Sequence, residues 1–322
     1  MDKDLGIYVA GHRGLVGSAI VKRLRDDGYL NIITRSHEEL DLTNQEATRR
    51  FFREAQPSYV FHAAGRVGGI GANSALPATF IAENILMSAN VIMAAYEIGV
   101  KKLLFFGSSC IYPKLCPQPI KEEYLLTGPL EETNAPYAIA KISGIELCKA
   151  YNRQYGTDYR AIMPTNLYGR GDRYAGSASH VIPAIIQKMH EAKVKGAASV
   201  KLWGTGRPLR DFLHSDDLAR AATLIMECSR KTFCAVSGQE GVLNVGSGAE
   251  IAIRDVAEEI RAAVGFDGEI VWDIDMPDGT PRKLVDIARV SALGWRPLIM
   301  LPDGLRDAYS DYIREHATSV SD

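Results

Sequence analysis

The sequence predicts an α/β protein built on a doubly wound parallel sheet, with a smaller C-terminal domain. Two observations support this prediction. From residue 6 to residue 169, short apolar runs alternate with longer stretches of helical periodicity, as in chains that fold into parallel strands joined by helices. A glycine-rich turn, GHRGLVG, directly follows the first apolar run, where doubly wound sheets bind nucleotides.

The elements of the first half follow one another in strand–helix order. We expect strands at 6–11, 31–35, 58–65, 101–109 and 159–169, and helices at 15–28, 44–56, 80–99 and 136–156. The strand runs are short and apolar on both faces, which is typical of a sheet covered by helices on both sides.

The rhythm loosens after Tyr168. A loop rich in glycine and serine is expected at 169–180, followed by a helix at 181–193. The segment 209–228 indicates a strand and a helix whose N-terminus is supplied by Ser215, Asp216 and Asp217, and one more buried strand is expected at 242–248. These patterns predict a nucleotide-binding domain of residues 1–165 and 212–249 and a substrate domain of residues 166–211 and 250–322.

The composition argues against several classes of protein. Of 322 residues, 46% are hydrophobic and 24% charged, and the formal net charge of −2 comes without a basic cluster for nucleic acid. The five cysteines form no C-x-x-C pair, so we expect reduced thiols and no metal site. Neither a signal peptide nor an apolar run of about 20 residues is evident, which predicts a soluble cytoplasmic protein.

Three glycines lie between the first strand and the first helix. Gly11 would make the tight turn, Gly14 would let the backbone approach a pyrophosphate, and Gly17 would let the helix pack closely on the strand. The spacing G-x-x-G-x-x-G differs from the commoner G-x-G-x-x-G of dinucleotide sites. Its place at a strand–helix junction nevertheless predicts a dinucleotide site.

The end of the second strand bears on the choice between NAD and NADP. An acidic residue there would bind the adenosine ribose, but this chain has Arg35 and His37, with Arg13 in the glycine turn. These cations favour NADP(H); the alternative is a solvated basic surface. Asp41 and Leu42 are candidates for lining the adenine pocket.

Tyr137 and Lys141 lie four residues apart on a predicted helix, so both side chains project from one face. An ammonium near the phenol would lower the pKa of Tyr137 toward the working range. A hydroxyl from Ser108 or Ser109, at the end of the fourth strand, would complete a hydrogen-bonding site for a carbonyl oxygen. This combination predicts a site that binds a carbonyl oxygen, in which Lys141 could also hold a nicotinamide ribose.

Several motifs resemble one family in particular. The segments AGHRGLVGSAI, RVGGI, GSSCIYPK, NAPYAIAK, MPTNLYG, WGTGRPLRDFLH and PDGTPRKL are similar to those of the GDP-L-fucose synthases, extended short-chain dehydrogenase/reductases with a Rossmann fold. The resemblance runs from Gly11 to Leu284. It implies 3,5-epimerisation of a GDP-4-keto-6-deoxy sugar, followed by NADPH-dependent reduction at C4.

The resemblance also implies roles for individual residues. Cys110 would be the base and His180 the acid of epimerisation, Ser108 and Tyr137 would stabilise the enolate, and Lys141 would tune the tyrosine. Cys116 is interpreted as incidental. The cofactor would be bound by Gly11, His12, Arg13, Gly14, Leu15, Val16, Gly17, Arg35, His37, Asp41, Leu42, Ala64, Gly65, Gly107, Ser108, Lys141, Pro164, Asn166, Leu167 and His180. The GDP-sugar would be bound by Lys188, Trp203, Arg210 and Asp278; the alternative for Trp203 is a core residue.

Three other functions remain open at this stage. The first is the same chemistry on a related GDP-4-keto sugar, leading to GDP-colitose or a GDP-6-deoxy-heptose. The second is an NAD-dependent 4-epimerase, which would leave Cys110 and His180 without roles. The third is a non-catalytic NADP-binding protein, from which loss of the tyrosine or lysine would be expected. The resemblance further implies a homodimer formed through the helices that contain Met87–Gly99 and Tyr137–Tyr155.

Overall fold

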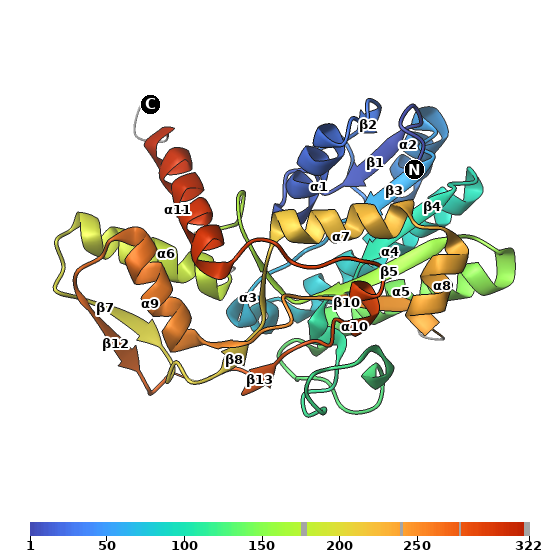
Figure 1. The fold of residues 1–322 in the computed structure, drawn as a ribbon. Helices are drawn as coiled ribbons and strands as arrows, with labels where there is room; N and C mark the ends of the chain where they lie inside the picture. Colours follow the sequence, from blue (N-terminus) through green and yellow to red (C-terminus); the bar gives the residue numbers. More distant parts are fainter. Residues whose placement is uncertain (175–178, 239–240, 277, 319–322) are drawn as a thin grey trace.

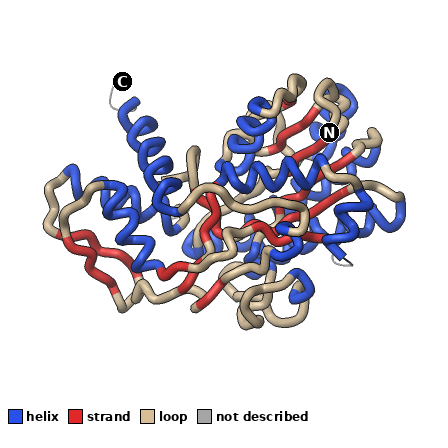
Figure 2. Tube along the Cα trace, viewed as in Figure 1, coloured by secondary structure: helices blue, strands red, loops and turns tan. Residues whose placement is uncertain are grey.

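A computed structural model describes residues 1–174, 179–238, 241–276 and 278–318. Figure 1 shows a larger part built around a twisted parallel sheet and a smaller part built from later segments of the chain. The helices and strands of both parts are distinguished by colour in Figure 2. Part of the predicted 169–180 loop, residues 175–178, lies outside the described residues.

The main sheet has six strands, all parallel, in the order β10-β5-β4-β3-β1-β2. The chain places β2 on one side of β1 and β3 on the other, so the direction of winding reverses between β1 and β3. The predicted fold class is therefore confirmed. The strand bounds are β1 (Ile7–Ala10), β2 (Ile32–Ile33), β3 (Tyr59–His62), β4 (Lys102–Phe106), β5 (Tyr159–Pro164) and β10 (Val242–Val245).

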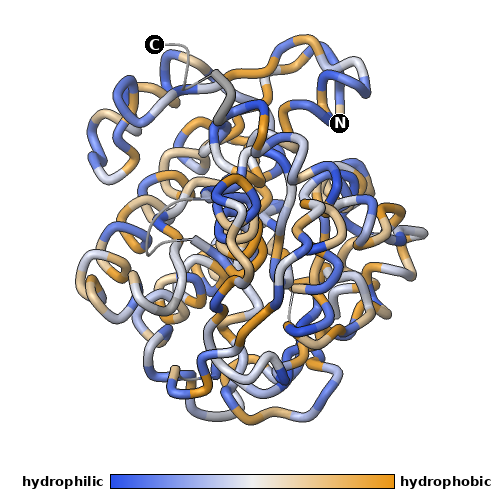
Figure 3. The backbone as a smooth tube through the Cα atoms, turned by 90° about the vertical axis from the view of Figure 1, so that its left-hand side faces the viewer, coloured by the Kyte–Doolittle hydropathy of each residue, from blue (hydrophilic) through white to orange (hydrophobic). Residues whose placement is uncertain are grey.

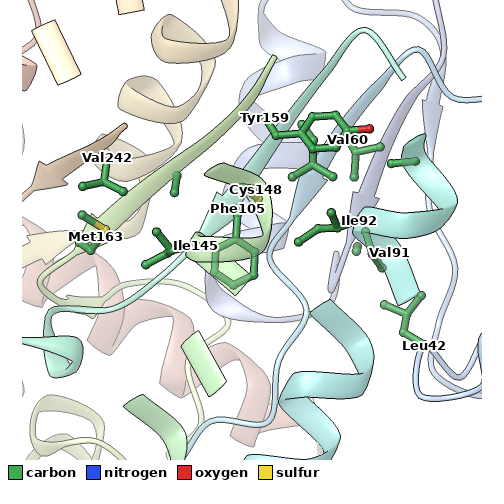
Figure 4. Close-up of a cluster of buried hydrophobic side chains, with 14 of the residues drawn as sticks. Leu42, Val60, Val91, Ile92, Phe105, Ile145, Cys148, Tyr159, Met163 and Val242 are labelled. Atoms are coloured by element: carbon green, nitrogen blue, oxygen red, sulfur yellow. The ribbon is translucent and has the colours of Figure 1, made fainter. Parts of the chain in front are cut away.

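Helices cover both faces of this sheet because successive strand residues point to opposite sides. Tyr8, Val60 and Phe105 pack in one cluster with side chains of α2 (Gln45–Ala55), α4 (Pro77–Glu97) and α5 (Ala135–Tyr155). Figure 4 shows part of this cluster, in which Phe105 comes from β4, Ile145 from α5 and Val91 from α4. The neighbouring strand residues, such as Val9 and Leu104, pack against α1 (Leu15–Asp26) and α7 (Ser215–Glu227).

The strand predicted at 159–169 is two strands. β5 ends at Pro164, and β6 (Asn166–Tyr168) pairs in a separate sheet with β9 (Phe212–His214). The change of sheet is held at Thr165, whose amide donates to Val245 O and whose hydroxyl donates to Asp211 O (both 3.0 Å). The chain thus leaves the main sheet at its carboxyl edge and enters the smaller part.

The N-terminus of α7 differs by one residue from the prediction. His214 is the N-cap, and its Nδ1 accepts a hydrogen bond from the Asp216 amide (3.2 Å). Ser215 is already the first helical residue. Asp216 and Asp217 lie in the first turn, where their negative charges interact favourably with the positive end of the helix dipole. An imidazole thus takes the capping position that the sequence assigned to a hydroxyl.

The smaller part has its own apolar core, formed by side chains between residues 168 and 212 and between 251 and 312. Val290 and Trp295, which the predicted boundaries assign to the substrate domain, pack into the core of the larger part, and the boundaries themselves remain a prediction.

Hydrophobic and hydrophilic residues alternate along the coils of the helices (Figure 3). The elements of the smaller part are α6 (Val181–Val194), β7 (Ser199–Trp203), β8 (Leu209–Arg210), β11 (Ile251–Ala252), α9 (Ile253–Val264), β12 (Glu269–Asp273), β13 (Arg282–Lys283) and α11 (Leu301–Thr318). Shorter elements elsewhere are α3 (Ile70–Ala75), η1 (Ser109–Ile111), η2 (Glu122–Tyr124), α8 (Arg230–Ser237) and α10 (Ala288–Ser291).

The helix expected at 80–99 is α4 (Pro77–Glu97), and it is strongly apolar. Among the described helices, α4 has the length and composition to cross a membrane, contrary to the expectation that no such segment exists. Its buried side chains, including Val91 and Ile92, pack in the sheet's core cluster. The apolar character of α4 is therefore accounted for, at least in part, by its packing against the sheet.

Candidate active site

The glycine turn after β1 is shaped by close backbone contacts. Gly11 has φ +79°, and a Cβ there would lie 2.8 Å from Ala64 Cα. A Cβ on Gly17 would lie only 2.1 Å from Gly11 O, so α1 could not approach the strand with any larger residue. Both glycines are required by the fold itself.

Gly14 is different, because packing does not require it. A Cβ there would meet only Gly11 O, at 3.5 Å. Gly14 is the N-cap of α1 and provides no side-chain hydrogen bond, so the first amides of the helix have no capping side chain. Open space beside uncapped helix amides fits a diphosphate, and the turn Gly11–Gly17 with Leu15 and Val16 would hold it.

The cations predicted to select NADP lie near the same turn. Arg13 pairs with Glu38 at 3.5 Å, and both side chains are exposed. The Arg35 guanidinium lies over the Phe51 ring, 5.3 Å from its centroid. The Asp41 carboxylate accepts hydrogen bonds from the amide and hydroxyl of Thr43, and Leu42 is buried in the core.

Other predicted cofactor residues follow the carboxyl ends of β3, β4 and β5. Ala64 and Gly65 follow β3, Gly107 and Ser108 follow β4, and Pro164 ends β5, with Asn166 and Leu167 just beyond. A Cβ on Gly65 would lie 3.0 Å from Asn84 Oδ1 and 3.4 Å from Lys141 Nζ, so this loop passes directly over the lysine. Parallel strands therefore bring these segments to one edge of the sheet.

Helix α5 positions Tyr137 and Lys141 by lying very close to β4. A Cβ on Gly144 would lie 2.3 Å from the Phe105 ring, so glycine is needed for this approach. Lys141 then reaches the end of β4, where its Nζ donates to Phe106 O (2.9 Å) and lies over the Tyr137 ring, 5.8 Å from its centroid. Sequence reasoning missed Gly144, because only the packed structure shows what a side chain there would meet.

The pKa values of this pair differ from the prediction. Burial, with a smaller contribution from Cys110, raises the pKa of Tyr137, while the Ser108 hydroxyl lowers it through a hydrogen bond. Burial also lowers the pKa of Lys141 to about 8. The expected lowering of the Tyr137 pKa by the ammonium is therefore wrong for this structure, in which the ammonium lies over the ring face. Tyr137 is held in its protonated form.

A buried histidine lies behind Lys141. His62, at the end of β3, is fully buried, and within the described residues neither ring nitrogen has a hydrogen-bond partner. Burial, and secondly the charge of Lys141, lowers the pKa of His62 to about 3. His62 is therefore neutral at physiological pH and adds no second positive charge beside the lysine. Sequence analysis did not single it out.

Cys110 lies in the short η1 helix that follows β4. Its amide donates to Ser108 Oγ (3.3 Å), and its side chain is half-buried. The thiol is close enough to Tyr137 and Arg210 to influence the pKa of both. The structure therefore brings Ser108, Cys110, Tyr137 and Lys141 into one cluster.

His180 is set apart from this cluster. It is the N-cap of α6, and within the described residues no hydrogen bond or ring contact joins its side chain to those four residues. Desolvation lowers the pKa of its imidazole, although the residue is accessible to solvent. The described structure gives it a place at the edge of the smaller part without a direct contact to Cys110.

The predicted substrate residues form two pairs. Lys188 lies over the Trp203 ring, 5.3 Å from its centroid, and Trp203 is 66% exposed, so the core alternative for this residue is wrong. Asp278 accepts hydrogen bonds from the amide and hydroxyl of Thr205 (2.9 and 2.6 Å) and contributes to the electrostatic environment of Arg210. Asp278 therefore also fixes the turn after β7.

A cation that sequence analysis did not single out lies beside Cys110. The Lys283 ammonium donates to Cys110 Sγ (3.7 Å), although the two residues are 173 positions apart in the chain. Lys283 belongs to the motif PDGTPRKL, but nothing in its local pattern distinguishes it from a surface lysine. Pairing of strands from distant parts of the chain creates the contact.

A glycine turn at the switch point of a parallel sheet, with Ser, Tyr and Lys at the same edge, defines a dinucleotide-dependent enzyme acting on a carbonyl group. The chain matches the NAD dependent epimerase/dehydratase family over residues 7–246 and belongs to that family. It is 53% identical over 313 residues to GDP-L-fucose synthase 1 of Arabidopsis thaliana, covering 97% of this chain and 94% of that one. Within the class, the chain therefore belongs to the GDP-L-fucose synthase family, which confirms the resemblance seen in its motifs.

Solved structures are similar over nearly the whole chain. A GDP-6-OMe-4-keto-L-xylo-heptose reductase from C. jejuni has a TM-score of 0.93 and 36% identity, covering 98% of this chain and 99% of that one. A GDP-L-fucose synthetase from Naegleria fowleri bound to NADP has a TM-score of 0.88 and 27% identity, covering 99% and 97%. The chain shares its fold with both.

Proposed function

We propose that the enzyme epimerises GDP-4-keto-6-deoxy-D-mannose at C3 and C5 and then reduces C4 with NADPH, giving GDP-L-fucose. The observation that carries the proposal is the Cys110 thiol beside the Ser108–Tyr137 pair. A reductase needs only serine, tyrosine and lysine, whereas an epimerase also needs an acid–base group for the hydrogens next to the ketone. The higher identity to a GDP-L-fucose synthase than to the heptose reductase supports this substrate.

The cofactor would lie along the carboxyl edge of the sheet. The amides at the start of α1 would bind its diphosphate, and Arg35 and Arg13 would face the 2′-phosphate of NADP. His37 and Asp41 would lie near the adenosine. Bound NADPH supplies the hydride for C4. The NADP-bound relative supports this choice of cofactor.

Epimerisation begins with the ketone at O4 between Ser108 and Tyr137. The Cys110 thiolate takes the proton from C3 or C5, and the electron pair of that C–H bond moves toward C4, leaving an enolate on O4. Hydrogen bonds from the serine and tyrosine hydroxyls stabilise this charge. His180, as the imidazolium, returns a proton to the same carbon from the opposite face, which inverts it. Before the second centre reacts, Cys110 releases its proton to solvent and His180 takes one up, and the same steps then invert that centre.

Reduction uses the same oxygen. Because burial holds Tyr137 protonated, its phenol can donate a proton to O4 as C4 becomes a secondary alcohol. The charge left on the phenolate is stabilised by Lys141, which must then be an ammonium. Tyr137 thus acts as a hydrogen-bond donor in epimerisation and as a proton donor in reduction.

The GDP-sugar would span the edge of the smaller part. Arg210 and Lys188 would bind the diphosphate, and the exposed Trp203 ring would offer an apolar face to sugar or base. Asp278, through its hydrogen bonds to Thr205, would keep the connecting turn in place. Arg210 is close enough to Cys110 for the two charges to interact, so a sugar whose diphosphate is bound at Arg210 would reach the thiol.

Deuterium exchange tests the proposal. The protein is incubated with GDP-4-keto-6-deoxymannose and NADP⁺ in D₂O, without NADPH, and the sugar is analysed by mass spectrometry. We expect deuterium at C3 and C5 with the wild type and with Cys116→Ser, and greatly reduced exchange with Cys110→Ser. If the wild type exchanges nothing yet oxidises NADPH with a keto sugar, the protein is a reductase only, and the proposal is wrong.

A related GDP-4-keto sugar is the second candidate. The close structural match to the heptose reductase favours it. Comparing kcat/KM for the 6-deoxymannose and heptose substrates distinguishes the two, since the preferred sugar should lead by well over tenfold.

We further infer a cytoplasmic homodimer. Leu86 and Tyr96 on α4, and Ile139 and Tyr155 on α5, are large apolar side chains that are 39–47% exposed. Tyr96 and Tyr155 stack at 4.4 Å and so join the two helices into one face. Sedimentation should give twice the chain mass, and Leu86→Glu should lower it.

A further inference from the structure

The Cys110 sulfur has a cation held against it. Lys283 Nζ donates a hydrogen bond to Cys110 Sγ at 3.7 Å. Among the described residues, Cys110 is the hydrogen-bond partner of the Lys283 ammonium. Lys283 is half-buried, and it lines a narrow cavity together with Cys110. The same ammonium influences the pKa of Cys116, so it lies near both thiols of this loop.

The fold fixes the position of Lys283 from two sides. In β13 it is the register partner of Arg210 in β8, so the two cations lie side by side at the site. The next residue, Leu284, donates its amide to Gln118 Oε1 (2.8 Å) and accepts from the Ile120 amide (2.7 Å). The strand that carries Lys283 is therefore joined to the loop that follows Cys110.

We propose that Lys283 is a positioning residue for Cys110: its ammonium holds the sulfur and keeps it as the thiolate that removes the sugar proton. The inference deepens the proposed function and rests on it for the proton transfer. In that step the thiolate gains the proton, the C–H electron pair becomes the enolate, and Lys283 remains an ammonium. A thiolate is the reactive form of cysteine, and a neighbouring cation favours it.

The other charged or titratable groups around Cys110 have other partners or lie further away. Arg282 pairs with Glu250 (2.7 Å), and Arg210 donates to Leu209 O (2.8 Å). Tyr137 is held protonated by burial and is uncharged. Glu131 accepts from the Asn134 amide, and Lys114 is exposed on the cavity rim. Of these groups, Lys283 is the cation that donates a hydrogen bond to the Cys110 sulfur.

Alkylation of Cys110 measures the thiolate without any substrate. Iodoacetamide is applied over a range of pH, and the tryptic peptide 103–114 reports Cys110 alone, because Cys116 falls in the next peptide. In Lys114→Met the peptide runs from 103 to 121, and fragmentation in the mass spectrometer assigns the label to Cys110 or Cys116. The exposed Cys234 serves as the internal reference. The variants are Lys283→Met, which removes the charge at similar length, Lys283→Arg, which restores it, and Lys114→Met, which removes a charge from the same cavity.

With Lys283→Met we expect Cys110 to be alkylated about tenfold more slowly at pH 7, with its profile moved to higher pH. Cys234 should be unaffected, Lys283→Arg should recover most of the rate, and Lys114→Met should match the wild type. Exchange at C3 and C5 should fall to a similar extent in Lys283→Met. Unchanged NADP⁺ affinity would show that the variant is folded.

An alkylation profile of Lys283→Met that matches the wild type overturns the inference, whatever the exchange rate. The same holds if Lys114→Met slows alkylation as much as Lys283→Met, since the effect would then be one of general charge. If alkylation responds as expected but the wild type exchanges no deuterium, the pairing stands and the proposed function fails. The two failures are therefore distinguishable.

Discussion

Lys141 should reduce the stability of the protein in order to serve its site. Its side chain is 4% exposed, and burial alone lowers its pKa from 10.5 to about 8. At about 1.4 kcal/mol per tenfold change in proton affinity, this difference corresponds to a cost of about 3 kcal/mol for the ammonium in the folded state. Replacing Lys141 with methionine removes that cost and keeps the length of the side chain.

The net gain should be smaller than the full cost. The ammonium donates to Phe106 O at 2.9 Å, and losing that hydrogen bond costs about 1 kcal/mol. We therefore expect Lys141→Met to be more stable than the wild type by about 2 kcal/mol at pH 7, while reductase activity is lost. Such a trade between stability and activity is common at catalytic sites.

The pH dependence gives the prediction its specific signature. The pKa of Lys141 is lower in the folded state than in the unfolded state, so the cost is complete below about pH 8. As the pH rises from about 8 to 10.5, the folded lysine is neutral while the unfolded one is still charged, and the penalty disappears. The stability difference between variant and wild type should therefore shrink over that range.

Urea unfolding at pH 7, 8.5 and 10, without added nucleotide, measures this difference. Lys149→Met is the matched control, because Lys149 lies on the same helix in a partly exposed pair with Glu146 (2.8 Å) and should change stability by less than about 0.5 kcal/mol. If Lys141→Met is no more stable than the wild type at pH 7, or if the difference is the same at all three pH values, the reasoning about Lys141 is refuted.

Three further predictions concern the rest of the site. Gly144→Ala should push α5 away from Phe105, because the added carbon would lie 2.3 Å from the ring. We expect this variant to be less stable by about 2 kcal/mol and to have a lower kcat. Ser143→Ala on the same helix is the control, and a Gly144→Ala variant that is fully active and equally stable would contradict the packing argument. Arg35→Ala should raise KM for NADPH about tenfold with little effect on NADH, and equal effects on both coenzymes would show that Arg35 does not bind the 2′-phosphate. NADPH-dependent reduction should fall as the pH rises through about 8, where Lys141 loses its proton; a rate that is flat to pH 9.5 would exclude this role.

The features that local sequence determined are those with a short period or a fixed spacing. Alternating apolar runs and amphipathic stretches were enough to predict the parallel sheet, because each strand and helix must bury its own face. The glycines of the first turn were recognised because only glycine permits the positive φ at Gly11 and the contact at Gly17. Tyr137 and Lys141 were recognised because four residues make about one turn of helix.

Where a strand ends was less predictable. The run 159–169 is apolar throughout, and no local signal shows that its second half joins another sheet. The division at Thr165 depends on hydrogen bonds to Val245 and Asp211, which are contributed by distant segments. Likewise, Trp203 could be placed at the surface only once its strand had been paired.

The chemistry of the site was decided largely by tertiary structure. The sequence by itself determined which fold forms and which side chains stand at the ends of its strands. It did not determine that burial would raise the pKa of Tyr137 and lower that of Lys141, nor that Lys283 would meet Cys110. The physical reason is that periodicity is a property of neighbouring residues, whereas desolvation and charge pairing depend on every segment that surrounds a group after folding.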